Sequence, residues 1–403
     1  MGDAAGIGAT GATATAERRA ALADALRDAR EYTLRLYAHL EPAQRDVPRL
    51  AIVNPPLWEL GHVGWFQEFW CRRWRRDDPV ATGAPSCLAD ADALFDSRHV
   101  AHEARWTLPL PDWAGVHAYL AATLADTLAR LPALPGAVLD LVEMAVLHEG
   151  MHGEAMLMTL HTLSLPAPPG FAPPAEDACP EAGDVVVDGG DVRLGPRADD
   201  GARFLFDNER EPHTVALRPF AIARRPVTCG EFAAFVDDGG YREPRWWSEA
   251  GRDWLAAAGR AHPADWRAAQ ETAGWEVRAF ERWTPLAAAA PLLHVNAHEA
   301  EAWCRWAGRR LPAEAEWEHA ARCGAIPFRG VAWEWTATPF LPYPGFVPGA
   351  YAEYSAPWFG DHRSMRGGSW ATRRRLPHPR FRNFYRPQRH DPFVGFRSCA
   401  LAD

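Results

Sequence analysis

The chain of 403 residues contains no lysine, because all 43 of its basic residues are arginine. Without a side-chain amine it cannot form a Schiff base with pyridoxal phosphate, and it cannot build a Walker-type phosphate loop, which needs a lysine. Cysteine is scarce as well. The seven cysteines are dispersed and form no CxxC pair, which argues against a disulfide framework and against a cysteine-based zinc site.

Long apolar runs are also missing, since none approaches the roughly 20 residues that span a bilayer. Residues 1–16 are rich in glycine, alanine and threonine and lack the charged-then-apolar pattern of a signal peptide. The formal net charge of −9 offers no basic face for nucleic acid. We therefore expect a cytoplasmic protein without nucleic-acid or membrane partners, and a disordered leader over residues 1–16.

Hydrophobic residues make up 48% of the chain and charged residues 24%, a composition typical of a soluble globular protein long enough for two domains. Residues 17–165 are predicted to be helical, with helices over 57–73, 113–131 and 137–163 after the first. Four such helices suggest a bundle, whose interior can collect ligands from facing helices. In the first helix, apolar residues recur at helical spacing: Leu22, Leu26, Tyr32, Leu36 and Leu40.

A proline-rich segment over 166–182 cannot continue a helix and is predicted to be a linker. From 183 to 403 the chain is richer in glycine, tryptophan and arginine, with short strands expected at 184–187 and 213–217 and helices at 229–236 and 297–307. Two stretches, 238–292 and 338–362, lack a regular period and are predicted to be irregular. The overall prediction is an α+β protein of two domains, the second rich in loops and ordered by buried tryptophan and paired arginine.

The strongest chemical signal is the pair His148 and His152 within the predicted fourth helix. Residues four apart lie on one face of a helix, so both imidazoles can reach one metal ion. Met144, Met151 and Thr159 lie on or beside the same face, which places the pair in the interior of the bundle. This spacing predicts a metal site.

His62 is the best candidate for a third ligand. The alternative is that it only packs among its aromatic neighbours Trp58, Trp65 and Phe66. Three histidine ligands would leave coordination positions open for a substrate and for dioxygen, as non-haem iron chemistry requires.

A rival interpretation comes from the same residues, because His148-Glu149-x-x-His152 matches the HExxH pattern of zinc peptidases. There Glu149 would be the general base. The longer HExxHxxGxxH form fails, since Ala155 and Met158 replace its glycine and histidine. Arg105 is a further candidate, as an anchor for a substrate carboxylate, and a surface arginine is its alternative.

Several segments of the second half resemble the formylglycine-generating-enzyme (sulfatase-modifying-factor) fold, and the resemblance covers nearly all of the chain after residue 183. Cys399 is the one cysteine near the position of that family's two catalytic cysteines, so formylglycine chemistry is not expected. The segments are 206–209 (FDNE), 225–232 (RPVTCGEF), 308–318 (GRRLPAEAEWE), 333–336 (WEWT), 366–370 (RGGSW) and 395–397 (GFR).

The whole chain resembles the two-domain sulfoxide-synthase family, in which a DinB-like bundle with an HxxxHxE motif precedes this second fold. The family includes ergothioneine-, ovothiol- and selenoneine-forming enzymes. The resemblance implies Fe(II) held by His62, His148 and His152. Glu154 is further predicted to orient a ligand histidine from outside the coordination shell. It also implies that a sulfur or selenium donor is joined to the imidazole ring of a histidine derivative with dioxygen. In the ergothioneine and selenoneine enzymes that derivative is hercynine, whose trimethylammonium group suits an aromatic wall.

Other roles are implied residue by residue. Asn383 matches the family's contact to the histidine substrate, and Phe384 an adjacent aromatic residue. Tyr385 stands where enzymes that use γ-glutamylcysteine have an aspartate that holds the donor's amine. Met151 stands where the HxxQH version has a substrate-contacting glutamine. Both departures argue against γ-glutamylcysteine as the donor.

The family's proton-donating tyrosine corresponds to Tyr351 or to Tyr354, and a buried tyrosine without a chemical role is the alternative for each. The segments 54–62 (NPPLWELGH) and 395–400 (GFRSCA) look most like the selenoneine-synthase branch, whose donor is a selenosugar. The alternatives are an ergothioneine-type synthase using cysteine or γ-glutamylcysteine and, more remotely, a zinc-dependent HExxH hydrolase or a DinB-type thiol transferase.

Overall fold

The computed structural model describes residues 4–75, 84–173, 182–197, 204–270, 273–328 and 330–401. The chain forms two compact units, Met1–Gly170 and Phe171–Asp403, and each is described by itself. Their boundary falls within the predicted linker over 166–182, of which residues 174–181 lie outside the described ranges.

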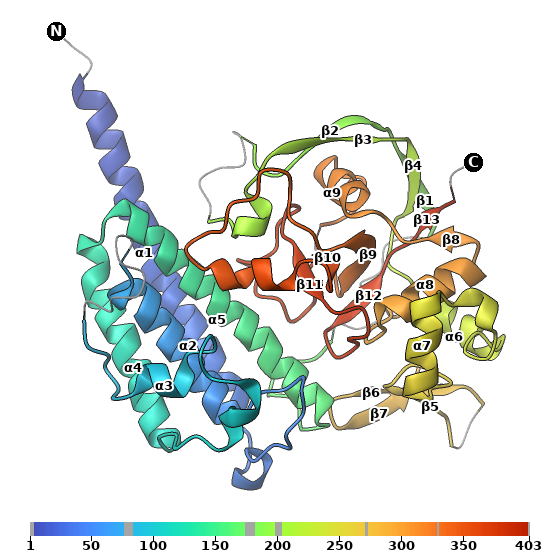
Figure 1. The fold of residues 1–403 in the computed structure, drawn as a ribbon, viewed down its shortest axis with the longest axis horizontal. Helices are drawn as coiled ribbons and strands as arrows, with labels where there is room; N and C mark the ends of the chain where they lie inside the picture. The colour runs from blue at the N-terminus through green and yellow to red at the C-terminus, as the bar shows by residue number, and fades with distance from the viewer. Residues whose placement is uncertain are drawn as a thin grey trace. The chain divides into compact units, whose positions relative to one another are not determined.

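The first unit is a bundle of four long helices (Figure 1). Helix α1 packs against α5, and α2 packs against both α4 and α5. Their facing sides carry a core of fully buried apolar residues, including Leu36, Phe66, Leu120 and Leu157, which confirms the predicted bundle. The helices are α1 (Ala4–Tyr37), α2 (Pro56–Glu68), α4 (Trp113–Arg130) and α5 (Gly136–Thr162), with a short α3 (Ala91–Phe95) between α2 and α4.

Two features of the bundle differ from the predictions. Helix α1 begins at Ala4, whereas a disordered leader was expected over 1–16, of which residues 1–3 lie outside the described ranges. Six alanines favour a helix over residues 4–16, although three glycines oppose it. The predicted helix 57–73 is α-helical only to Glu68, and Phe69–Arg73 widen into a π-helical turn.

The second unit contains two four-stranded sheets. In one, the order is β1 (Asp184–Val187), β4 (Phe220–Ala223), β13 (Cys399–Ala400) and β8 (Arg309–Arg310), all antiparallel. In the other, the order is β11 (Asn383–Tyr385), β10 (Arg363–Gly367), β9 (Trp333–Pro339) and β12 (Val394–Phe396), where β12 runs parallel to β9.

A hairpin of β2 (Gly190–Leu194) and β3 (His213–Leu217) and a three-stranded meander complete the strands of this unit within the described ranges. The meander consists of β5 (Trp266–Ala268), β6 (Trp275–Ala279) and β7 (Arg282–Pro285), and the helices are α6 (Cys229–Asp237), α7 (Glu249–Ala258), α8 (Ala297–Trp306) and α9 (Glu314–Arg322). The α+β class with two domains is thus confirmed.

The prediction of an irregular stretch over 238–292 is wrong, because it contains α7 and the meander. Helix α7 is only ten residues long, but it carries ordinary boundary signals: the Ser248 side chain accepts from the Gly251 amide, and Gly259 ends the helix at a φ of 62°. Every residue of β6 is half-buried, so no alternation of apolar and polar residues marks the strand.

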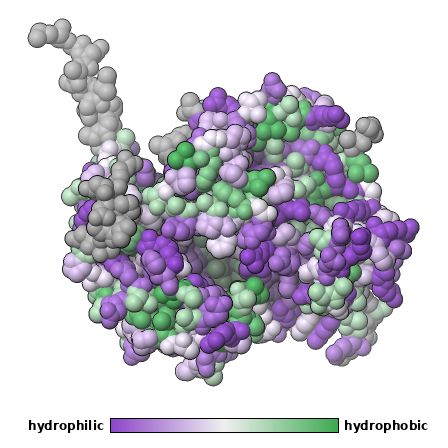
Figure 2. Space-filling view, viewed as in Figure 1, coloured by the Kyte–Doolittle hydropathy of each residue, from purple (hydrophilic) through white to green (hydrophobic). Residues whose placement is uncertain are grey.

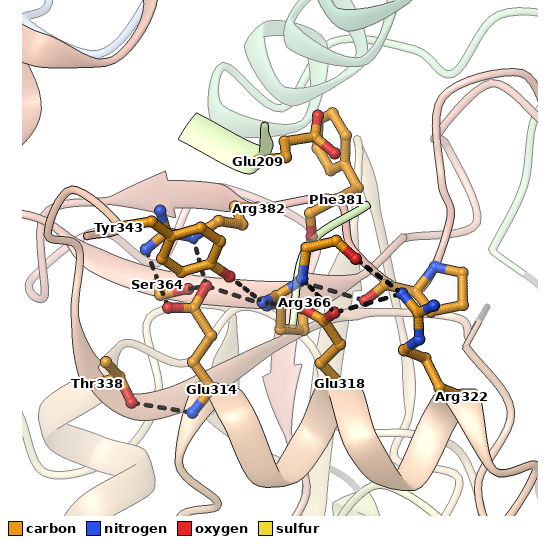
Figure 3. A network of polar contacts seen from close by, with 12 residues as sticks. Glu209, Glu314, Glu318, Arg322, Thr338, Tyr343, Ser364, Arg366, Phe381 and Arg382 are labelled. Carbon is orange, nitrogen blue, oxygen red and sulfur yellow. Dashed lines mark hydrogen bonds and ion pairs between the residues drawn. The ribbon is translucent and has the colours of Figure 1, made fainter. Parts of the chain in front are cut away.

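Buried charge orders the middle of the second unit (Figure 3). Glu314 and Glu318 lie one turn apart on α9, and each meets a buried arginine: Arg382 Nε donates to Glu314 Oε1 at 2.7 Å, and Arg366 Nη2 donates to Glu318 Oε2 at 2.8 Å. Arg382 immediately precedes β11. The pairing of α9 with Arg382 therefore fixes the strand that carries Asn383, Phe384 and Tyr385.

Hydrophilic and hydrophobic side chains are interspersed on the face seen in Figure 2. Within the part of the chain that the structure describes, no helix combines the length and the apolar character needed to cross a membrane.

Candidate metal centre

Three histidines meet inside the bundle. His62 comes from the middle of α2, and His148 and His152 come from successive turns of α5. Each offers a ring nitrogen, and the three nitrogens lie within 4.8 Å of one another. The ring centroids are 5.2 Å apart for His62 and His148, 4.9 Å for His62 and His152, and 4.5 Å for His148 and His152. This separation fits a single metal ion bound by three imidazoles.

Hydrogen bonds fix the orientation of two of these rings. His62 Nδ1 lies 2.8 Å from the backbone oxygen of Phe95 and donates to it, because a carbonyl can only accept. His152 Nδ1 lies 2.9 Å from Glu59 Oε1. Each ring then has Nε2 left to bind a metal, an arrangement typical of metal-binding histidines.

The site also favours the neutral imidazole that a metal needs. Only 3% of His62 and 4% of His148 is exposed. Burial lowers the pKa of both rings well below the ordinary histidine value, and the neighbouring His152 lowers the pKa of each further. A neutral histidine has a free lone pair, so both rings are suited to bind a metal at neutral pH.

Aromatic rings hold the histidines from the sides. His62 stacks on Trp58, with centroids 5.0 Å apart and planes at 9°, and on Trp65 at 5.8 Å. Phe66 stacks on His148 at 3.5 Å. His62 therefore does pack among aromatic residues, as the alternative interpretation expects. Its ring is also a neighbour of the other two histidines.

Glu149, the general base of the zinc-peptidase interpretation, is engaged elsewhere. Its Oε1 accepts from Arg30 Nε at 2.8 Å, and both side chains are 3% exposed. Arg30 also donates to Gln67 Oε1 at 2.6 Å. A carboxylate held in a buried ion pair and network cannot turn toward a metal-bound water without breaking it. The geometry therefore does not support the HExxH mechanism.

Glu59 is a functional candidate that the sequence analysis missed, since it predicted Glu154 as the carboxylate behind a ligand histidine. The structure puts the Glu59 carboxylate on His152, while Glu154 lies buried two residues further along α5. Met151, on α5 as well, is half-buried. The roles predicted for Glu154 and Met151 stay predictions.

Arg105 lies beside the histidine cluster rather than fully in solvent. Its guanidinium lies over the Trp58 ring at 3.9 Å, and Nη1 donates to Asn54 Oδ1 at 2.6 Å. Burial lowers its pKa to about 10, so it stays charged at neutral pH. Among the described residues it forms no ion pair with a carboxylate, and Glu59 and Glu103 act on its charge only through space. The cation is thus available for an anionic group of a ligand.

The second unit brings together most of the residues predicted to bind substrate. Asn383, Phe384 and Tyr385 form β11, paired with β10. Phe384 stacks on Phe340 at 4.0 Å, and the ring of Tyr354 meets Phe384 edge-on at 5.8 Å.

The two candidate proton donors are neighbours, with ring centroids of Tyr351 and Tyr354 5.8 Å apart. Tyr354 also stacks on Phe206 at 4.0 Å. Burial raises the pKa of the Tyr354 phenol well above its ordinary value, so that phenol keeps its proton at neutral pH. Tyr385, which stands where related enzymes have an aspartate, lies under the Arg389 guanidinium at 5.0 Å.

Comparison with known proteins covers both units. The DinB superfamily matches residues 25–156, and the sulfatase-modifying factor enzyme 1-like domain matches residues 170–329 and 323–401. A formylglycine-generating enzyme of Streptomyces coelicolor is 36% identical, but over only 44% of this chain and 59% of its own.

Two hercynine oxygenases match far more of the chain. That of Mycobacterium tuberculosis is 36% identical over 93% of this chain and 97% of its own, and that of Mycolicibacterium smegmatis is 34% identical over 94% and 98%. Both domains are thus matched in order and over nearly their full length, and the chain belongs to the hercynine oxygenase family.

Proposed function

We propose that the protein is an Fe(II)- and O2-dependent enzyme that joins a selenium or sulfur donor to the imidazole ring of hercynine and oxidises the joined atom to the selenoxide or sulfoxide. These two two-electron oxidations together use one O2, of which one oxygen atom enters the product and the other leaves as water. The observation that carries this proposal is the cluster of His62, His148 and His152, the first two of them buried, in a chain of the hercynine oxygenase family. Iron bound by three histidines supplies reactivity toward dioxygen and leaves coordination positions open for substrates.

The chain's own residues hold this centre and limit its access to water. Hydrogen bonds from His62 to Phe95 and from His152 to Glu59 keep the ligand rings turned toward one point. The rings of Trp58, Trp65 and Phe66 close the sides of the cluster. These apolar surroundings favour neutral histidine, which is the form that binds a metal, and they strengthen electrostatic interactions within the site.

Hercynine combines a carboxylate with a trimethylammonium cation, and the chain offers a partner for each. A quaternary cation cannot donate a hydrogen bond but is attracted to aromatic faces, such as that of Phe384 with Tyr354 at its edge. The amide of Asn383 can hydrogen-bond the substrate. Arg105, a cation without a carboxylate partner within the described ranges, is suited to a carboxylate of the substrate or donor.

The reaction also needs a proton at neutral pH, and Tyr351 or Tyr354 is the proposed source. A phenol whose pKa is raised, as in Tyr354, gives up its proton only to a strongly basic acceptor. Such a residue can therefore stay protonated until the reaction generates that base.

A selenosugar is the proposed donor, which would make the enzyme a selenoneine synthase. A sugar has no amino-acid head group, and the neutral Tyr385 replaces the aspartate that would pair with an amine. Met151 also favours a donor other than γ-glutamylcysteine, because it replaces the substrate-contacting glutamine of the HxxQH version of the motif. An ergothioneine-type synthase using cysteine or γ-glutamylcysteine is the alternative.

The donor is tested by competition. Purified protein is loaded with Fe(II) without air, supplied with hercynine and equal amounts of selenosugar, cysteine and γ-glutamylcysteine, and then exposed to air, and the products are identified by mass spectrometry. We expect the selenium-containing product of hercynine to exceed the sulfur-containing products. If the main product contains sulfur, the proposed selenosugar donor is wrong, while the proposed oxidative synthase activity stands. If no donor gives a product, the proposed synthase activity itself is wrong.

A further inference from the structure

Two hydrogen bonds link three helices of the bundle through a buried carboxylate. Tyr37, the last residue of α1, donates from its hydroxyl to Glu59 Oε2 at 3.1 Å. Glu59, in the first turn of α2, meets His152 Nδ1 of α5 with Oε1 at 2.9 Å. The exposed fraction is 1% for Tyr37 and 0% for Glu59. The Glu59 carboxylate is therefore shielded from solvent, while the side chain of His152 is 19% exposed.

Among the described residues, no arginine lies within ion-pair distance of the Glu59 carboxylate, and its contact with His152 Nδ1 is an ion pair only when that imidazole is protonated. In the described part of the chain its side-chain hydrogen bonds are those from Tyr37 and His152, and Arg105 acts on it only through space, without an ion pair. A buried carboxylate without a cation is costly. A divalent metal on Nε2 of His152 would place positive charge across the imidazole from this carboxylate, which would stabilise both.

We infer that Glu59 is the positioning residue of the three-histidine centre and that Tyr37 holds Glu59 in place, so that metal binding is coupled to the end of α1. The inference rests on the metal centre of the proposed function, but on neither its reaction nor its donor. Glu59 fixes the His152 ring in the tautomer that presents Nε2. Tyr37 occupies the second carboxylate oxygen and keeps Glu59 from rotating away.

The same helix contains a matched control. Glu68 of α2 is buried like Glu59, and Tyr119 donates to its Oε2 at 2.7 Å. Ser86 and the Cys87 amide also donate to this carboxylate, both at 2.5 Å, and Arg73 Nε lies 4.0 Å from its Oε2. Glu68 thus reproduces the buried tyrosine–glutamate pair without a ligand histidine, so Glu68→Gln reports the general effect of losing such a carboxylate.

The test measures cobalt binding by the metal-free full-length protein, because the visible absorption of Co(II) reports both affinity and ligand geometry without any turnover. Glu59→Gln is expected to raise the Kd for Co(II) about 10–100-fold, Tyr37→Phe by a smaller factor in the same direction, and Glu68→Gln less than about twofold. His148→Ala, which removes a ligand, should abolish the cobalt spectrum.

Wild-type affinity in Glu59→Gln, with cobalt binding lost in His148→Ala, would overturn the inference and leave the metal centre standing. An equal loss of affinity in Glu68→Gln would overturn it too, since the effect would then belong to the bundle as a whole. Wild-type cobalt binding by His148→Ala would refute the metal centre and the inference with it. If Glu59→Gln folds poorly, Tyr37→Phe carries the test, because it keeps the packed ring and removes only the hydroxyl.

Discussion

Arg30 and Glu149 form an ion pair inside the helical bundle, with Arg30 Nε donating to Glu149 Oε1 at 2.8 Å and each side chain 3% exposed. The pair explains why a sequence that contains HExxH need not act as a zinc peptidase. The glutamate of the motif is a structural partner of α1, while the two histidines face α2.

Glu149→Gln should therefore act on stability rather than on metal binding. Loss of one partner leaves the buried Arg30 charge uncompensated, which is expected to lower the free energy of unfolding by about 3–5 kcal/mol. Urea unfolding measures this, and metal analysis of the folded fraction should show unchanged iron. As a control, Asp140→Asn removes a more exposed pair, with Arg18, and should cost less than about 1 kcal/mol. A stable Glu149→Gln variant that has lost its activity would instead indicate a catalytic glutamate.

Arg105→Gln should weaken the binding of a carboxylate-bearing substrate. A hydrogen bond to a charged group contributes about 1.5–3 kcal/mol, so KM is expected to rise roughly 10- to 100-fold. Steady-state kinetics with hercynine and with each donor varied in turn will show which of the two loses affinity. Arg27→Gln, on an exposed position of α1, is the control. Unchanged KM values for both substrates would exclude Arg105 from the site.

Replacement of the proton donor should lower kcat with the metal still in place. Of Tyr351→Phe and Tyr354→Phe, one is expected to reduce kcat about 10²- to 10⁴-fold, while iron content stays that of the wild type. Rapid mixing with oxygenated buffer measures the rate, and metal analysis provides the control. Normal kcat in both variants would contradict a tyrosine donor.

Acid should destabilise the second unit through Glu314. Although burial opposes its charge, the guanidinium groups of Arg382 and Arg366 lower the pKa of Glu314 to about 2, from an ordinary 4.5. A carboxyl group whose pKa is lower in the folded state contributes stability above pH 4.5. That contribution, about 3 kcal/mol, is lost as the pH falls from about 4.5 to about 2.

Glu314→Gln should accordingly be less stable than the wild type at pH 7, and its stability should depend less on pH between 4.5 and 2. Urea unfolding at a series of pH values, followed by tryptophan fluorescence, measures both. A variant whose stability falls as steeply with acid as that of the wild type would assign the acid sensitivity to other groups.

Helical periodicity was sufficient to predict the bundle and the pairing of His148 with His152, because both depend on contacts along one helix. His62 lies on a different helix from His148 and His152, so spacing along one helix does not predict that the three meet. Its role as a third ligand is inferred from the metal-binding chemistry of histidine. In the second unit, the helices predicted at 229–236 and 297–307 correspond to α6 and α8. The meander β5–β7 was not predicted, since its half-buried strands give no alternating pattern.

Glu59 shows most clearly where prediction from this sequence stops. An acidic residue in the first turn of a helix is ordinarily explained by the helix dipole. The sequence instead favours Glu154, which follows His152 in an HxxxHxE motif, as the carboxylate beside a ligand histidine. The contact between Glu59 and His152 depends on how α2 packs against α5, and helical spacing within either segment does not encode it.

The most direct test of the account compares the protein loaded with Fe(II) and with Zn(II), each given hercynine and the donor mixture with and without dioxygen, and quantifies modified hercynine by mass spectrometry. An iron-dependent oxidative synthase forms product only when Fe(II) and O2 are both present, with loss of one O2 for each product formed. Product formed by the zinc-loaded protein in the absence of O2 would contradict the proposed synthase activity and favour a hydrolase or a thiol transferase.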